Sequence, residues 1–371
     1  MTFDHFASSM GIIAAALTIA TGLLPPSPQQ APQKPVPPQA QNPESVQQGM
    51  EVLARGPIHE AFARPIDPRP GPGPVVSKQP PDPIDELPAE QKPTGENVEW
   101  IPGYWAWEED RKDFIWVGGV WRAPPPGEQW VPGHWAQVTG GWQWVPGFWT
   151  DVQANEVQYL PQPPEPIEAA PSSLQPSADS VYVPGNWLYV DNRYAWRAGY
   201  WVTYRPGWVW IPAHYIWSPN GYIFIEGHWD YDLEERGLLF APIFFERPLW
   251  QAASWVFRPQ YVISADYLMG CLFVGPGLRH YYFGDYFAAA DVRLGFKAWI
   301  DFRYGRYGYD SLFSYYRWAH RSDPRWETNL RTLYTGRIHG TIARPPRANS
   351  NCDFRLALIF LHPREQPRRP F

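Results

Sequence analysis

The sequence contains little cysteine, little charge and no long hydrophobic segment. Its two cysteines, Cys271 and Cys352, are too few for a disulfide framework or a zinc site, although one bridge between them stays open if the protein is exported. Only 18% of the 371 residues are charged. The longest uncharged hydrophobic run, residues 10–24, has 15 residues, fewer than the roughly 20 that a membrane-spanning helix needs. The sequence therefore argues against a disulfide-stabilised fold and against a transmembrane helix.

Proline and aromatic residues are present in excess. The chain has 45 Pro, 22 Trp, 21 Tyr and 19 Phe, and its proline content is more than twice the average of about 5%. So many aromatic residues exclude a disordered chain, a coiled coil and a collagen, and they argue against a common α/β enzyme. The composition favours an aromatic-rich β protein attached to a proline-rich spacer.

Residues 1–24 are expected to form a signal peptide or a short anchor. Small residues at Thr18, Ala20 and Gly22 offer cleavage positions, and a Pro/Gln-rich stretch follows. No Lys or Arg precedes the hydrophobic run, so an uncleaved anchor stays open. We expect export to the periplasm, the cell envelope or the extracellular space, with no transmembrane span after signal cleavage.

Residues 25–98 read as a disordered, proline-rich linker. They hold 19 of the prolines, and proline removes backbone donors and disfavours helix at the residue before it. One exception lies at residues 52–63, where apolar side chains could face one side of a short helix. That helix is either a docking element for the folded region or for a partner, or a transient helix within the linker.

An aromatic motif recurs, and five of the seven steps between successive units are 14 residues long; the first step is 16 and the step between the two blocks is 38. Each unit has an aromatic residue, two further residues, a glycine, one residue and a second aromatic residue, and 17 of the tryptophans lie between residues 100 and 229. The units are 100–105, 116–121, 130–135, 144–149, 182–187, 196–201, 210–215 and 224–229. Turn sequences such as Ser218-Pro-Asn-Gly221 separate them.

The repeat predicts a mainly β fold, an antiparallel meander of eight bulged, aromatic-rich strands. Two tryptophans five residues apart would face opposite sides of a regular strand, so a bulge at each Pro-Gly is expected to bring them to one face. The strands would form one curved sheet or barrel, or two four-stranded sheets. The repeat blocks cover residues 99–151 and 181–232, and the proline-rich insert between them covers residues 152–180.

The units 130–135, 194–201 and 222–229 resemble the YXWGXW (WXXGXW) repeat of a family of bacterial envelope proteins. Residues 52–63 and 313–318 also resemble stretches of its larger members, which extends the resemblance over roughly residues 50–345. The resemblance implies export and carries over no catalytic residue. The chain departs from the pattern at Gly118, Ala213 and Glu226.

Residues 233–345 form a Tyr/Arg-rich region that is expected to be mixed α+β and to cover one face or edge of the meander. Strands are predicted at 237–245 and 254–264, a helix from Asp310 to about His320, and a second helix from about Trp326 that ends at Gly336. Residues 346–371 are a basic tail that matches nothing expected of the family.

Catalytic and metal-binding signals are weak. The sequence has no nucleophile elbow, phosphate loop, dinucleotide fingerprint or paired-cysteine motif. His134, His214 and His228 share one repeat position, and acidic residues alternate from Asp230 to Glu235, but amphipathic strands and a solvated turn explain both patterns more simply. We expect no enzyme activity, no catalytic residue, no metal and no cofactor.

Two functions of different classes remain. The first is a noncatalytic structural or scaffold protein of the bacterial cell envelope, in which most tryptophans are buried. The second is a carbohydrate- or peptidoglycan-binding module with exposed aromatic rings; an enzyme of unknown type is a third. The expected partners are cell-wall glycan or other envelope proteins, and no nucleic acid. The binding residues of a glycan binder would be Trp105, Trp121, Trp135, Trp149, Trp187, Trp201, Tyr215 and Trp229.

Overall fold

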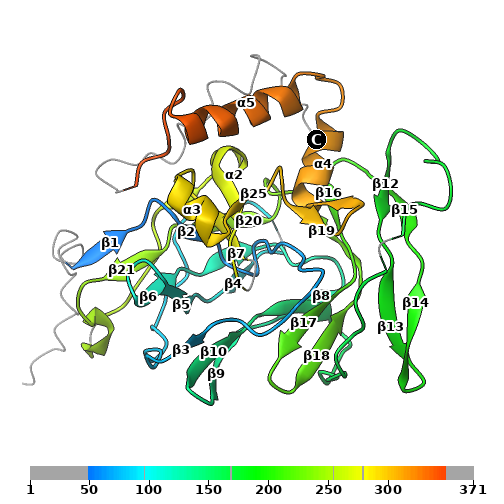
Figure 1. Ribbon diagram of the computed structural model, residues 1–371. Coiled ribbons are helices and arrows are strands. Elements are labelled where there is room, and N and C mark those ends of the chain that lie inside the picture. Colours follow the sequence, from blue (N-terminus) through cyan, green and yellow to red (C-terminus); the bar gives the residue numbers. More distant parts are fainter. Residues whose placement is uncertain (1–48, 96, 168, 254, 278–279, 348–371) are drawn as a thin grey trace, which may run out of the picture. The chain divides into compact units, whose positions relative to one another are not determined.

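Four long β-hairpins, each built from two repeats, dominate the structure (Figure 1). The computed structural model describes residues 49–347 except 96, 168, 254, 278 and 279. The predictions for residues 1–48, for the tail after residue 347 and for pairing of Cys352 lie outside this part of the chain. Across the described residues, no helix has the length and apolar character that crossing a membrane requires.

Every strand of these hairpins is split at its Pro-Gly or equivalent dipeptide. Hairpin 1 consists of β4 (Glu99–Ile101), β5 (Tyr104–Glu108), β6 (Asp113–Val117) and β7 (Val120–Arg122). Hairpin 2 consists of β8 (Glu128–Val131), β9 (His134–Val138), β10 (Gly141–Val145) and β11 (Phe148–Asp151). Hairpin 3 consists of β12 (Ser180–Val183), β13 (Asn186–Val190), β14 (Arg193–Arg197) and β15 (Tyr200–Thr203). Hairpin 4 consists of β16 (Trp208–Ile211), β17 (His214–Ser218), β18 (Gly221–Ile225) and β19 (His228–Tyr231).

The split is symmetric, which corrects the predicted bulge. In hairpin 1, Ile101 pairs with Val120 and Tyr104 pairs with Val117. Two residues on each strand therefore lie between these pairs, whereas a bulge sets unequal numbers of residues against each other. Proline has no N–H to give to the ladder, so the pairing stops on both strands and resumes in the same register. The two tryptophans of a repeat each face a partner on the opposite strand.

The hairpins do not join into a meander. The fold is mainly β and antiparallel, as predicted, but the strands form neither one eight-stranded sheet, nor a closed barrel, nor two four-stranded repeat sheets. The β6–β7 edge of hairpin 1 pairs instead with β20 (Gly237–Phe240) and β21 (Ile243–Phe245). These two strands are extended in turn by β22 (Val262–Ile263) and β1 (Met50–Val52). Within hairpin 2, β10 pairs with β3 (Val75–Val76). Segments distant in sequence thus occupy the edges that a meander would have used.

The segment expected to be a linker packs against the repeats along its described part. Between β1 and β2 (Gly56–Pro57) and just beyond, Ala54, Ile58, Ala61 and Phe62 are buried in the main core. The docking interpretation of residues 52–63 is therefore correct, without the predicted helix. Much of residues 64–95 is extended and free of regular structure, because proline limits both helix and ladder formation.

The C-terminal region is mixed α+β, as predicted. It contains η1 (Leu249–Gln251), α2 (Ala265–Cys271), β23 (Leu272–Val274), β24 (Tyr281–Phe283), α3 (Ala289–Leu294), β25 (Lys297–Ala298), β26 (Arg303–Tyr304), β27 (Gly308–Tyr309), α4 (Ser311–Ala319) and α5 (Trp326–His339). The Asp310 side chain caps α4 by accepting the backbone N–H of Phe313 at 3.0 Å. Helix α5 runs through Gly336 and ends at Gly340, which is left-handed (φ 75°), so the predicted end was wrong.

Candidate functional site

The two aromatic residues of each repeat form cross-strand ring pairs. In hairpin 1, Trp100 faces Trp121 and Trp105 faces Trp116, each pair with ring centroids 5.3 Å apart in an edge-to-face arrangement. The other hairpins pair Trp130 with Trp149, Trp135 with Trp144, Tyr182 with Trp201, Trp187 with Trp196, Trp210 with Trp229 and Tyr215 with Phe224. The aromatic periodicity is therefore a pairing pattern that holds the two strands of a hairpin together on both sides of the split.

None of the eight residues proposed for glycan binding is fully exposed. Trp105, Trp149 and Tyr215 are buried, with exposed fractions of 4%, 8% and 8%. The half-buried members are Trp121, Trp135, Trp187, Trp201 and Trp229. The structure brings only Trp187 and Tyr215 to the same cavity, where the Tyr215 hydroxyl also donates to the Trp187 carbonyl at 2.9 Å. The eight rings thus form no single exposed row.

The glycine of each repeat lies beneath an aromatic ring of the opposite strand. A Cβ atom at Gly133 would stand 2.5 Å from Cζ2 of Trp144, a distance that real Cβ atoms do not reach. The same close approach occurs at Gly103, Gly119, Gly147, Gly185, Gly199 and Gly227. At the equivalent place in hairpin 4, Phe224 replaces the larger indole and Ala213 replaces glycine. In this pair, a ring smaller than indole and an alanine therefore occur together.

Proline-rich segments lie along the hairpins and accept hydrogen bonds from their aromatic side chains. In hairpin 1, the indole N–H of Trp105 donates to the Asp82 carbonyl at 2.8 Å, and that of Trp121 donates to the Ala89 carbonyl at 3.0 Å. In hairpin 2, Trp149 donates to Ala61 at 3.2 Å. In hairpin 3, the donors Trp187, Tyr194 and Tyr182 bond the carbonyls of Glu165, Pro161 and Ala169 in the proline-rich insert.

Two glutamates enter the split of a hairpin and bond the repeat glycines. The Glu86 carboxylate accepts the backbone N–H of Gly103 at 2.7 Å and of Gly119 at 3.0 Å, together with the indole N–H of Trp116 at 3.0 Å. Glu60 repeats this arrangement in hairpin 2, where Trp144 donates to Oε1 at 3.1 Å and Gly147 donates to Oε2 at 2.8 Å. Because the split leaves these amides outside the ladder, a carboxylate satisfies them.

The two carboxyl groups have opposite electrostatic surroundings. Burial raises the pKa of Glu86 to about 7, since its hydrogen bonds to Gly119, Trp116 and Gly103 only partly offset the loss of water. Burial also opposes ionisation of Glu60, but the nearby His280 and Arg64 outweigh it and lower its pKa to about 2. The His280 Nε2 atom lies 2.6 Å from Oε1 of Glu60. Glu60 is therefore a buried anion, whereas Glu86 changes charge near neutral pH.

A buried ion cluster joins hairpins 1 and 4, and the sequence did not signal it. Asp230 lies between Arg122, at 2.5 Å, and Arg236, at 2.9 Å, and all three side chains are at most 5% exposed. The two guanidinium groups also donate to the carbonyls of Ala61 and Phe62. The acidic side chains that follow Asp230 have separate hydrogen-bond partners. Asp232 accepts the hydroxyl of Tyr315, and Glu234 accepts the hydroxyl of Tyr316.

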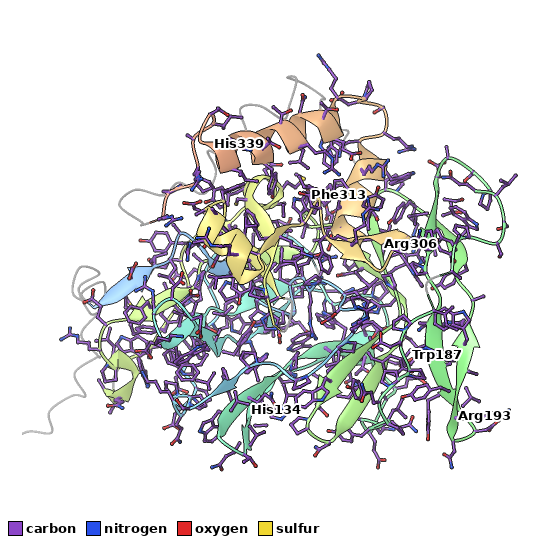
Figure 2. The ribbon with its side chains drawn as sticks, viewed as in Figure 1. His134, Trp187, Arg193, Arg306, Phe313 and His339 are labelled. Carbon is purple, nitrogen blue, oxygen red and sulfur yellow. The ribbon has the colours of Figure 1, made fainter. Side chains whose placement is uncertain are left out.

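The three repeat-position histidines do not converge. His134, labelled in Figure 2, is exposed on β9. His214 and His228 line a small internal cavity of about 50 Å³ with Asp230 and Arg236, and burial lowers the pKa of His214 to about 3. Within the described part of the chain, no group of three or more His, Cys, Asp or Glu side chains could hold a metal ion.

A cavity of about 270 Å³ lies between hairpins 3 and 4. Its aromatic lining comes from Trp187, Tyr215 and Tyr307, and the rest of the wall includes the proline-rich insert. Arg303 and Arg306 reach it from the β26–β27 hairpin; Trp187 and Arg306 are labelled in Figure 2. We call this feature the hairpin cavity. It is the place where aromatic, cationic and proline-rich surfaces meet.

A family model described as WXXGXW repeat (2 copies) matches residues 100–122, 111–136, 129–150, 181–202 and 205–230. The chain therefore carries WXXGXW repeats, and the matched segments together cover the four hairpins described above. This confirms the resemblance of the repeats within residues 100–230. Comparisons with curated proteins and with solved structures give no match.

Proposed function

We propose that the protein is a noncatalytic scaffold of the bacterial cell envelope whose tryptophan hairpins hold extended proline-rich chain segments. The observation that carries this proposal is the repeated donation of indole and phenol groups to carbonyls of such segments on hairpins 1, 2 and 3. Proline-rich backbone is extended before binding and leaves its carbonyls free, so an aromatic surface with N–H donors suits it. In this proposal, the many aromatic side chains serve to bind proline-rich segments to the hairpins.

The envelope location rests on the hydrophobic run at residues 10–24 and on the family resemblance of the repeat. Partners in that compartment would be other envelope proteins or cell-wall glycan. A chain with this many tryptophans involved in ring pairs and carbonyl bonds gains rigidity, which is what a scaffold requires.

Cell fractionation tests the proposal. A C-terminally tagged full chain is expected in the periplasmic or envelope fraction of a bacterial host, whereas the Leu17→Arg variant, which breaks the hydrophobic run, is expected to stay in the cytoplasm. A change at the exposed residue Arg193, Arg193→Glu, controls for expression. Wild-type protein that remains cytoplasmic together with the Leu17→Arg variant contradicts the envelope role.

A carbohydrate- or peptidoglycan-binding module is the second candidate, because Trp187 and Tyr215 both line the hairpin cavity. Sugar rings stack on such side chains, and a bound glycan would change the fluorescence of Trp187. Titration with soluble peptidoglycan fragments should then give a saturable change that the Trp187→Phe variant reduces. A flat response across the panel removes this candidate.

A further inference from the structure

Hairpins 1 and 2 show what kind of segment this architecture recognises. Each holds a stretch of the chain that contains proline and carries a glutamate. Residues 80–89, with Glu86, are extended, whereas residues 57–66, with Glu60, include a turn in which the Phe62 and Ala63 amides donate to the His59 carbonyl. In both cases the carboxylate meets amide and indole donors, while backbone carbonyls of the segment accept further indole N–H groups. The shared chemistry is therefore a proline-containing segment that presents a carboxylate, and residues 80–89 are the extended, net acidic example of it.

The hairpin cavity has aromatic, proline and arginine side chains in its wall and an open volume of about 270 Å³. Trp187 and Tyr215 supply the aromatic wall, and prolines from residues 68–70 and 163–166 supply apolar surface. Asn186 lines the cavity as well; its Oδ1 atom accepts from Arg197 at 2.9 Å, while its buried Nδ2 atom has no partner among the described residues. An unsatisfied buried amide nitrogen is a donor that an incoming carbonyl or carboxylate would satisfy.

The cavity lining has more cationic than anionic residues, with Arg69, Arg303 and Arg306 against Asp67. Arg303 donates to the Tyr309 hydroxyl at 3.1 Å and Arg306 lies over the Tyr307 ring, but none of the ion pairs of the described residues includes either arginine. The third arginine of the lining, Arg69, is paired with Glu165 at 2.9 Å. Two guanidinium groups are therefore left to face an acidic ligand, and guanidinium groups bind carboxylates in a bidentate manner.

We propose that the hairpin cavity binds an extended, proline-containing acidic peptide segment of another protein, with Arg303 and Arg306 on its carboxylates, the Asn186 amide nitrogen on a backbone carbonyl and the Trp187 ring against its prolines. The other protein supplies a segment of the kind that residues 80–89 supply to hairpin 1. This names the partner class of the proposed scaffold and so rests on that function. The binding test uses purified protein, so its failure is distinguishable from failure of the fractionation test.

Fluorescence anisotropy with a labelled peptide tests the proposal. The probe is the sequence of residues 80–90, Pro-Pro-Asp-Pro-Ile-Asp-Glu-Leu-Pro-Ala-Glu, added to the full chain. Saturable binding is expected, and it should weaken about tenfold when Asn and Gln replace the acidic residues, because one lost charge contact at an interface rim is of that order. A third peptide with alanine in place of every proline tests whether an extended backbone is required, and it should also bind less tightly.

Variants place the binding at the cavity. Arg306→Glu should lower the affinity for the probe peptide about tenfold or more, and Arg306→Ala should lower it less. Arg193→Glu reverses a charge on the same set of hairpins, at the exposed β13–β14 turn outside the cavity, and should leave the affinity within about twofold. Equal affinity for acidic and neutral peptides, an Arg306→Glu variant that binds as wild type does, or competition by peptidoglycan fragments but no direct peptide binding would each overturn the proposal.

Discussion

The indole ring of Trp130 lies so close to Gly147 that a Cβ atom on Gly147 would stand 2.4 Å from Cζ2 of the ring. The Gly147→Ala variant must therefore move the ring or the strand, and we expect it to lose about 1–3 kcal/mol of unfolding free energy. Urea denaturation measures this loss. Gly71→Ala is the control, because no atom lies within 4 Å of the added methyl group.

Hairpin 4 suggests how an alanine at such a glycine can be accommodated. There, Phe224 and Ala213 take the places that Trp144 and Gly133 hold in hairpin 2. The double variant Trp144→Phe, Gly133→Ala should therefore be more stable than the sum of its two single variants predicts, by at least about 0.5 kcal/mol. Additive losses would show that ring size and glycine are not coupled.

The unfolding free energy should decrease as pH rises, because the buried Glu86 carboxyl group must lose its proton. Its pKa is about 7 in the fold against an ordinary 4.5, so between these values the folded chain holds a proton that the unfolded chain has lost. The unfolding free energy then decreases as pH rises, by at most about 1.4 kcal/mol per pH unit. The Glu86→Gln side chain stays neutral, so the variant lacks this decrease. In thermal melts, its melting temperature should therefore rise relative to that of the wild type between pH 5 and pH 7.5.

The matched control for this titration is Glu90→Gln, because the Glu90 side chain is 85% exposed. It should follow the wild-type curve throughout. If the Glu86→Gln and wild-type curves also run parallel, the raised pKa of Glu86 is wrong.

Removing the charge of Asp230 should destabilise the fold strongly. In Asp230→Asn the buried guanidinium groups of Arg122 and Arg236 lose their counterion, and breaking a buried ion pair from one side costs about 3–5 kcal/mol. Glu109→Gln removes an exposed pair with Lys112 and should change the unfolding free energy by less than about 1 kcal/mol. Similar small losses in both variants would mean that the cluster is hydrated.

Cys271 should be unreactive in the native protein. Its side chain is fully buried, its S–H donates to the Tyr267 carbonyl at 3.1 Å, and burial raises the pKa of the thiol to about 12. In a Cys352→Ser background, labelling by a thiol-specific disulfide reagent at pH 8 should be at least about a thousandfold slower than in denaturant, because only the thiolate reacts. Rapid native labelling would contradict the buried position.

Local features of the fold could be predicted because local residues determine them. The Asp310 cap of α4 is a contact between neighbours in sequence, and the repeat predicts one strand per unit. The end of α5 was misjudged because Gly336 is tolerated inside the helix, where it packs against Ile342, and the left-handed turn comes at Gly340. The cluster around Asp230 had no sequence signal, since its arginines lie in a strand and a loop far apart in the chain.

The sequence by itself determined that this is an aromatic-rich β protein with WXXGXW repeats, because ring spacing and turn residues act over about ten residues. Only the tertiary structure decided that the repeats pair as separate hairpins, that residues 54–63 of the proline-rich segment contribute to the core, and which rings line a cavity. The physical reason is that indole N–H groups and unpaired glycine amides need acceptors. Sequence periodicity does not show that these acceptors are carbonyls and carboxylates tens of residues away.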